Sequence, residues 1–368
     1  MHYRRMPIEI EAPEWIGYQH IECNLSESSF ADQRLKDLGI SVDELVLFYG
    51  HHQGKTELRE CIALEAALQP SEVLITAGAA SALFIVATSL LQKGDHLVVQ
   101  KPNYGTNIET PLAIGANVSF LPLQFENAFR LDLSELEKQI TPHTKLVSLT
   151  YPHNPTGVSI DESTLHRLIL LIEKHNVFLL LDETYREMVF GKKLPVAASL
   201  SDKVITVSSM SKAYGLAGIR IGWIACKNTA LMKTFLAAKE QIFITNSVID
   251  EAIAYQYLQK KHVLFTPVKE KIRQHFEIMK SFMQQQSILE WVEPAGGCVC
   301  FPRIRKEIDI DMQQFHEELL KKYKTYLGRG HWFDEDPRFI RIGYGWETTE
   351  KLSKGLQHIL DAVAFLQQ

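Results

Sequence analysis

The lysine at position 212 stands in a segment rich in groups that could do chemistry. Residues 208–220 read SSMSKAYGLAGIR, so serine hydroxyls, including those of Ser209 and Ser211, flank Lys212, and Arg220 follows eight residues later. A lysine in a partly desolvated pocket near another cation has a lowered pKa and becomes an amine nucleophile, as Schiff-base chemistry requires. A solvated loop lysine is the alternative for an isolated Ser-Lys pair, so the companion motifs carry the argument.

Two more polar motifs directly follow apolar runs. Asn154 lies in YPHNPTG (151–157), where two prolines fix the backbone. Asp182 begins the motif DETY (182–185), which directly follows the apolar run 177–181. Ligands of open α/β sheets bind outside the carboxyl ends of the strands. The 28 residues from Asn154 to Asp182, and the 30 from Asp182 to Lys212, each match one strand-helix-strand unit. These three polar groups are therefore predicted to converge, although alone the first motif would be a turn and Asp182 a helix cap.

A run of small residues, TAGAAS at 76–81, lies where a strand gives way to a predicted helix over 80–91. Backbone N–H groups at a helix N-terminus attract anions, and side chains as small as those of Gly78, Ala79 and Ala80 let a phosphate approach. Tight turns often contain small residues, so this motif gains its meaning from the others.

The elements that must position these residues alternate between strand-like and helical patterns over about 72–226. Five apolar runs, at 73–76, 97–99, 145–149, 177–181 and 204–207, are continuous, which predicts strands buried on both faces and mostly parallel. About eleven residues separate the last run from 219–224, too few for a parallel crossover, so that strand is predicted to be antiparallel. Ser159 and Glu162 have the spacing of a capping box ahead of a helix.

The chain of 368 residues exceeds the size at which one hydrophobic core stops growing, so we expect two domains or one large domain with a smaller satellite. Longer helices follow residue 255, with a strand-like run at 297–301 and a closing helix over 348–366. The prediction is an α/β fold: a mostly parallel central sheet with one antiparallel strand and helices on both faces. This large cofactor-binding domain would span 46–255, and a smaller α+β domain would combine 1–45 with 256–368.

Composition excludes several classes of protein. With 46% hydrophobic residues, 23% charged residues and a net charge of −5, the chain resembles an average soluble protein and offers no electrostatic footprint for nucleic acid or an anionic membrane. Five cysteines without a C-x-x-C pair indicate reduced thiols and a cytoplasmic location. No signal peptide or membrane span is predicted. His51 and His52 would point apart on a strand, so no metal site is expected.

Taken together, the order of these motifs and the S-x-S-K-x(7)-R spacing resemble pyridoxal 5'-phosphate-dependent aminotransferases of class I/II, with the aspartate aminotransferase-like fold (fold type I). The resemblance implies the cofactor pyridoxal 5'-phosphate and an enzyme that moves an amino group between an amino acid and a 2-keto acid. A lyase that performs β-elimination, or a cyclising or oxidising enzyme of the same fold, shares these residues and stays an alternative. A non-catalytic binding module is disfavoured because Lys212 is intact.

The resemblance also implies roles for individual residues. Lys212 would bind the cofactor covalently and then serve as general base and acid. Asp182 would pair with the ring nitrogen, while Asn154 and Tyr185 would hydrogen-bond the ring's phenolic oxygen. The phosphate would be held by Gly78, Ala79, Ala80, Ser209, Ser211 and Arg220, and Tyr104 in KPNYG (101–105) would stack on the ring.

Substrate and partner roles follow from the same resemblance. Arg341 in PRFIRIGYG (337–345) would bind the substrate α-carboxylate beside Asn154, with Arg338 as the fallback. Tyr49 would reach the phosphate of a neighbouring subunit, which implies a homodimer with shared active sites. The segment 22–28 lacks the glycine that many members carry there.

The side-chain specificity is expected to differ from that of strict aspartate enzymes, because the segment 241–247 contains no arginine. Four aromatic residues would suit a neutral or aromatic substrate, or would simply belong to the core: Trp15, Tyr18, Phe243 and Trp332.

Overall fold

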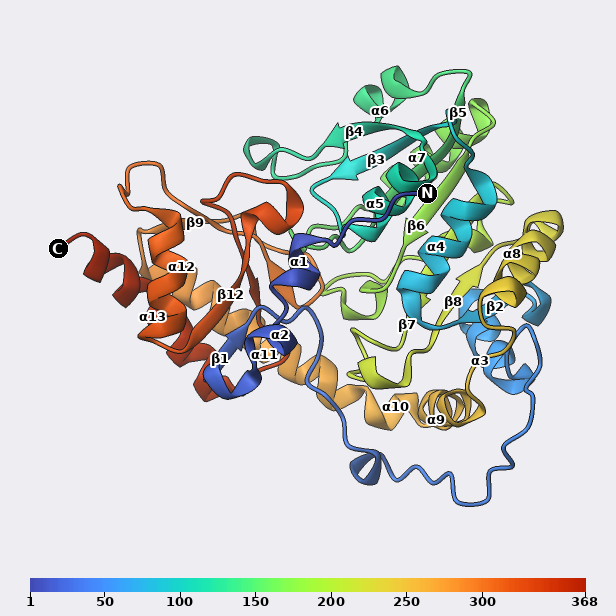
Figure 1. Ribbon diagram of the computed structural model, residues 1–368, viewed down its shortest axis with the longest axis horizontal. Helices are drawn as coiled ribbons and strands as arrows, with labels where there is room; N and C mark the ends of the chain where they lie inside the picture. The colour runs from blue at the N-terminus through green and yellow to red at the C-terminus, as the bar shows by residue number, and fades with distance from the viewer.

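Seven strands build the central sheet of the computed structural model, which describes residues 1–368 (Figure 1). They lie in the order β2-β8-β7-β6-β5-β3-β4. Their bounds are β2 Val73–Thr76, β3 His96–Lys101, β4 Asn117–Pro122, β5 Thr144–Thr150, β6 Phe178–Asp182, β7 Val204–Ser209 and β8 Gly222–Ala225. The pairings from β7 to β4 are parallel, whereas β8 is antiparallel to both β2 and β7. The predicted mostly parallel sheet with one antiparallel strand is confirmed.

Helices cover both faces of this sheet because its strands are apolar on both sides. Leu179 and Leu181 of β6 join a core with Leu168 of α7 (Glu162–Lys174), whereas Leu180 joins a core with Ile85 of α4 (Gly78–Leu90). Alternate residues of a strand point to opposite faces, so one continuous apolar run serves both layers. The helices α5 (Thr106–Ile114) and α8 (Thr229–Ile242) flank α4, and α6 (Leu133–Gln139) adds Leu136 to the α7 side.

The register of the parallel strands sets where their polar ends lie. Thr150 of β5 lies opposite Asp182 of β6, and Asp182 lies opposite Val207 of β7. The carboxyl ends of these three strands therefore meet at one edge, and the loops that follow them carry the predicted functional residues.

A second sheet unites the two ends of the chain. It has the order β1-β12-β13-β10, with β1 at Cys23–Leu25, β10 at Val299–Cys300, β12 at Thr325–Arg329 and β13 at Ile340–Gly343. The strand β1 pairs in parallel with β12, so the N-terminal segment completes a sheet of C-terminal strands. A separate hairpin-like pair joins β9 (Leu289–Glu290) to β11 (Arg303–Ile304). The helices around these strands are α11 (Thr266–Gln285), α12 (Met312–Lys321) and α13 (Thr349–Leu366).

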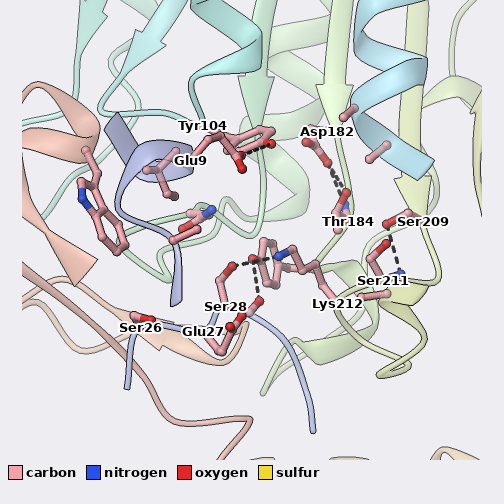
Figure 2. Close-up of a pocket in the computed structure, with 18 of the residues that line it drawn as sticks. Glu9, Ser26, Glu27, Ser28, Tyr104, Asp182, Thr184, Ser209, Ser211 and Lys212 are labelled. Carbon is pink, nitrogen blue, oxygen red and sulfur yellow. Dashed lines mark hydrogen bonds between the residues drawn. The ribbon is translucent and has the colours of Figure 1, made fainter. Parts of the chain in front are cut away.

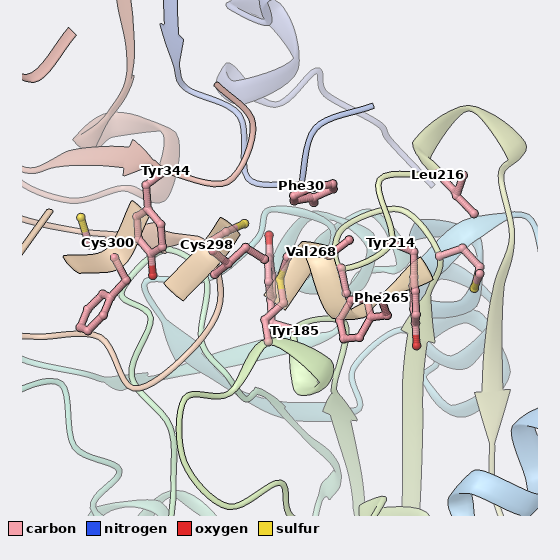
Figure 3. Close-up of a cluster of buried hydrophobic side chains, with 14 of the residues drawn as sticks. Phe30, Tyr185, Tyr214, Leu216, Phe265, Val268, Cys298, Cys300 and Tyr344 are labelled. Carbon is pink, nitrogen blue, oxygen red and sulfur yellow. The ribbon is translucent and has the colours of Figure 1, made fainter. Parts of the chain in front are cut away.

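The largest hydrophobic cluster runs between the two sheets (Figure 3). It includes Ile75 of the central sheet and Leu356 of α13, and Tyr185 and Cys298 lie near its middle. The cluster also includes residues of α3 (Thr56–Ala66) and α9 (Val248–Gln259), and Phe265, which follows α10 (Lys261–Leu264). Two short helices, α1 (Pro7–Ile10) and α2 (Pro13–Ile16), lie near the N-terminus. No helix combines the length and apolarity that a membrane span requires.

Several boundaries differ from the sequence prediction. The edge strand β4 was not predicted, since only one of its residues is buried and its apolar signal is weak. The strand β8 begins at Gly222 because 217–219 form a 3-10 turn. The predicted capping box is wrong: Asp161 caps α7, and its Oδ1 accepts a hydrogen bond from the Thr164 amide at 2.6 Å. An aspartate immediately before the first helical residue provides the cap directly.

Candidate active site

A cavity of about 250 Å³ opens at the carboxyl edge of β5, β6 and β7 (Figure 2). Residues from the N-terminal segment, the central sheet and the smaller sheet line it together. Eleven of the predicted site residues lie on its wall: Ala79, Ala80, Tyr104, Asn154, Asp182, Tyr185, Ser209, Ser211, Lys212, Arg220 and Arg341. Gly78 adjoins this wall as the first residue of α4, whereas Tyr49 lines a separate surface hollow.

Lys212 lies in the loop between β7 and β8 and points toward the loop that follows β1. Its Nζ donates a hydrogen bond to Ser28 Oγ at 3.0 Å. Burial lowers the pKa of Lys212; Glu27 opposes this effect and Arg341 adds to it. Desolvation and a neighbouring guanidinium thus favour the neutral amine that nucleophilic attack requires.

Asp182 is the last residue of β6 and is held by its neighbour Thr184. Its Oδ1 accepts hydrogen bonds from the Thr184 amide at 2.9 Å and from Thr184 Oγ1 at 2.6 Å. Burial raises the pKa of the Asp182 carboxyl, and the two Thr184 hydrogen bonds and Lys212 oppose this rise. The other oxygen receives no hydrogen bond from the protein, so it is free to pair with a protonated ring nitrogen.

The start of α4 and the 211–220 loop form a cradle for an anion. Gly78 has φ +79°, and a Cβ there would lie 2.4 Å from Arg220 Nη2, so only glycine lets the guanidinium approach the helix so closely. Arg220 Nη1 donates to Ser211 Oγ at 3.3 Å and to the Ala217 carbonyl at 2.8 Å. The first N–H groups of a helix have no partner within it. The Arg220 guanidinium, the serine hydroxyls and the free N–H groups of α4 together fit the phosphate of pyridoxal 5'-phosphate.

Arg341 on β13 supplies a second anion site inside the same cavity. It is 3% exposed, and it donates from Nη2 to the Ser26 carbonyl at 2.6 Å and from Nη1 to Asn154 Oδ1 at 3.2 Å. Its Nε has no hydrogen-bond partner and the guanidinium forms no ion pair. A buried unpaired cation of this kind calls for a carboxylate. Arg338 instead bonds the carbonyls of Arg305 and Ile308, away from the cavity.

The two predicted tyrosines take different partners. Tyr185 donates from its hydroxyl to the Ser28 carbonyl at 2.8 Å, and Tyr104 donates to Glu9 Oε1 at 3.3 Å. Both rings line the cavity. The N-terminal helix α1 thus reaches the ring that was predicted to stack on the cofactor.

Sequence reasoning missed the N-terminal contribution to the site. Glu9 of α1, Glu14 of α2, and Glu27 and Ser28 after β1 all line the cavity. No motif marks these residues, and their placement depends on the pairing of β1 with β12. Of the four aromatic residues proposed for the substrate side, only Trp332 lies on the wall.

Comparison with known proteins identifies the family. The model of aminotransferase class I and II matches residues 27–359, which is most of the chain. The protein belongs to this family. Among relatives of the aminotransferase, capreomycidine synthase of Streptomyces vinaceus is 28% identical over 94% of this chain and 91% of the relative. The arginine-pyruvate transaminase AruH of Pseudomonas aeruginosa is 28% identical over 82% of this chain and 80% of the relative.

Solved structures agree with this assignment. A PLP-dependent aminotransferase from Streptococcus suis superposes on this aminotransferase with a TM-score of 0.92, at 26% identity and with 100% of each chain covered. The protein is therefore an enzyme of this class, a pyridoxal 5'-phosphate-dependent aminotransferase that acts on an amino acid and a 2-keto acid.

Proposed function

We propose that the cavity around Lys212 is the site of amino transfer, and that its residues have the roles predicted from their motifs. One observation carries this proposal: an amine nucleophile, a carboxylate, an anion cradle and a buried guanidinium open into one cavity of about 250 Å³. Bound pyridoxal 5'-phosphate supplies an electron sink for the pair released at the substrate α-carbon.

The chain's own groups would hold the cofactor from three sides. The α4 amides of Ala79 and Ala80, with Ser209, Ser211 and Arg220, would neutralise the phosphate. Asp182 would keep a proton on the ring nitrogen, since Thr184 fixes the carboxylate and leaves one oxygen free. Asn154 and Tyr185 would hydrogen-bond the phenolic oxygen, and the Tyr104 ring would cover the cofactor.

Lys212 would move the proton. A lysine whose pKa is lowered by burial accepts a proton from a carbon acid more readily near neutral pH and can return it at a second atom. Arg341 would hold the substrate carboxylate with two parallel hydrogen bonds, and its contact with Asn154 fixes the guanidinium plane. The substrate would thus present its α-hydrogen to Lys212 in one orientation.

The functional unit that we propose is a homodimer with shared sites. Residues 46–49, Val-Leu-Phe-Tyr, are all exposed, with Tyr49 at 81%. Leu47, Phe48 and Tyr49 border a surface hollow whose other wall is residues 245–249. An exposed apolar patch of this kind marks an interaction surface. Tyr49 does not line the Lys212 cavity of its own chain, which leaves it available to a partner subunit.

We also propose the domain division and the location that the sequence predicts. A boundary near 45 and another near 255 would separate the central sheet from the sheet that unites β1 with β12 and β13. A cytoplasmic location is supported by five cysteines that are all unpaired.

The test is to incubate the holoenzyme with amino acids and 2-oxoglutarate. Glutamate formed in equal amount to the donor consumed supports amino transfer, whereas pyruvate and ammonia without a keto-acid acceptor would establish the lyase instead. Asp182→Asn should retain bound cofactor and lose turnover by on the order of a hundredfold or more. Asp202→Asn, at an exposed position, serves as the matched control, and full activity in Asp182→Asn would refute the proposed electron-sink role.

A further inference from the structure

We propose that the substrate of this site is an amino acid with a cationic side chain, which Glu27 and Glu14 bind while Arg341 holds its α-carboxylate. The inference rests on the proposed function and adds a substrate class to it. It replaces the neutral or aromatic side chain expected from the sequence.

Besides Asp182, three glutamates line the cavity that contains Lys212: Glu9 from α1, Glu14 from α2, and Glu27 from the loop after β1. Figure 2 shows Glu9 and Glu27 at this wall. Glu27 Oε1 receives one long hydrogen bond, from the Tyr18 hydroxyl at 3.5 Å, and Glu9 receives one from Tyr104. Glu27 is half-buried and Glu9 and Glu14 are exposed, and none of the three lies within 4.0 Å of a lysine, arginine or histidine nitrogen, whereas the buried Glu187 has two such lysine partners. These glutamates therefore have no direct ion-pair partner within the protein.

Glu27 is the most constrained of these carboxylates. Burial raises its pKa; Lys212 and Arg341 oppose the rise, while Glu14 and Asp32 reinforce it. A desolvated carboxylate beside like charges is costly, and a cation placed between Glu27 and Glu14 would relieve both the desolvation and the repulsion. A neutral side chain in that place would leave both carboxylates unpaired.

Arg341 supplies independent evidence for a charged ligand. It is 3% exposed, its Nε lacks any partner, and it lines the same cavity without an ion pair. It is anchored to the Ser26 carbonyl, the residue directly before Glu27. The site thus needs an anion at Arg341 and a cation near the glutamates, which is the charge pattern of an amino acid with a basic side chain. A dicarboxylate would bring a further negative charge to the glutamates, so its binding is disfavoured.

The geometry of the glutamates suits a planar cation. Guanidinium groups pair with carboxylates through two parallel hydrogen bonds, whereas an ammonium binds as a point charge. Tyr18 donates to Glu27 Oε1 at 3.5 Å and stacks on Trp346, and neither of these two rings lines the cavity. An arginine-like side chain therefore matches the two glutamates more completely than an ammonium does.

The test compares ligands that differ in one charge. In the holoenzyme, calorimetry measures Kd for 5-guanidinopentanoate and for 5-ureidopentanoate, which have the same length and cannot react because they lack an α-amino group. We expect the guanidino compound to bind at least about tenfold more tightly, as charge-assisted hydrogen bonds to a carboxylate require. The kcat/KM for L-arginine should exceed that for L-citrulline by a similar factor.

Variants locate the preference. Glu27→Gln and Glu14→Gln should each reduce the guanidino-to-ureido ratio of Kd, and the double variant should bring it close to one. Glu22→Gln is the control, because Glu22 lies just before β1 but pairs with Lys354 on the surface. If Glu27→Gln fails to fold or to hold cofactor, the ratio in the unmodified enzyme and in Glu14→Gln still decides.

Each outcome separates the two proposals. Equal Kd values for the two pentanoates would overturn the inference, and turnover of neutral donors would then leave amino transfer intact. Tighter binding of the guanidino compound without glutamate formation from any donor would refute amino transfer at this site and leave charge selection standing. A preference that survives in the double variant would also overturn the assignment to Glu27 and Glu14.

Discussion

Arg341 donates a hydrogen bond from Nη1 to Asn154 Oδ1 at 3.2 Å, and this contact joins the smaller sheet to the loop after β5. The two residues are 187 positions apart in the chain. One is the candidate carboxylate site and the other lies where the cofactor ring would be held. With the proposed roles, the contact would couple the position of the substrate to the position of the ring.

Replacing Arg341 with lysine tests this coupling. Lysine keeps the charge but loses the planar fork and the contact with Asn154, so kcat/KM for the amino donor should fall by roughly 10- to 100-fold. Cofactor absorbance should stay unchanged. Arg338→Lys is the control, because Arg338 bonds backbone carbonyls outside the cavity. Equal losses in both variants would show that Arg341 has no special role toward the carboxylate.

Gly78→Ala tests the phosphate cradle. The new Cβ would stand 2.4 Å from Arg220 Nη2 at a φ of +79°, so the guanidinium must move away from the start of α4. The Kd for pyridoxal 5'-phosphate, measured by absorbance titration of the apoprotein, should rise about tenfold or more.

Gly94→Ala isolates the backbone effect. Gly94 also has a positive φ, +90°, but a Cβ there would meet nothing within 4 Å. This variant should lose about 1 kcal/mol of stability and keep the cofactor affinity of the unmodified protein. An unchanged Kd in Gly78→Ala would refute the cradle, and a weakened Kd in both variants would attribute the effect to backbone strain.

The sequence predicts those site residues whose position depends on nearby parts of the chain, and misses those whose position depends on segments far away in the sequence. Asp182 and Lys212 follow buried apolar strands, and neighbouring parallel strands carry their ends to one edge, so local pattern and sheet register suffice. Glu27 and Ser28 reach the cavity only because β1 pairs with β12, about 300 residues away. No local periodicity encodes such a pairing, and the carboxylates of α1 and α2 carry no motif.

The fold shows the same division. Continuous apolar runs predict the buried strands β5, β6 and β7, whereas the edge strand β4 is partly exposed and lacks that signal. The cap of α7 illustrates a purely local error. Ser159 and Glu162 have the right spacing for a capping box, but Asp161 lies adjacent to the helix and accepts the hydrogen bond from Thr164. Neighbouring side chains compete to cap the first turn of a helix, and the spacing of a motif alone does not show which of them does so.

We expect Lys212 to make the stability of the apoprotein depend on pH. Burial lowers its pKa below the ordinary value of 10.5, and the titratable groups around it are Glu27, Arg341, Cys298 and Glu9. Between the lowered pKa and 10.5 the unfolded chain binds more protons at this residue than the folded chain does, so the free energy of unfolding rises with pH through that window.

The measurement compares the free energy of unfolding of the apoprotein with that of a variant whose side chain at position 212 cannot titrate. Urea unfolding of the apoprotein and of Lys212→Met at several pH values up to about 10 should give a difference that grows with pH in favour of the protein with lysine. Lys138→Met, at an exposed position of α6, is the matched control for the loss of a lysine at the surface. A difference that stays constant with pH would mean that burial does not perturb Lys212.

Tyr49 is the residue whose proposed role requires a second subunit. It is 81% exposed and lies outside the Lys212 cavity, so in a single chain it has no task at the phosphate. If it reaches the site of a partner, Tyr49→Phe should remove a hydrogen bond to the cofactor phosphate and with it nearly all turnover, and Lys212→Ala should abolish turnover from the other side of the same site. A hybrid dimer of the two variants would contain one site with both residues intact.

Mixing the two inactive dimers under conditions that exchange subunits therefore gives a quantitative expectation. Random reassociation makes half of the dimers hybrid, each with one intact site of two, so activity should recover to about a quarter of that of the unmodified enzyme. Mixing Lys212→Ala with Asp182→Asn is the control for exchange: both residues come from the same chain's strand ends, so no intact site forms. Recovery in the first mixture and not in the second would require Tyr49 to act across the interface, whereas no recovery in either, with subunit exchange verified by mass, would place Tyr49 outside the active site of the partner.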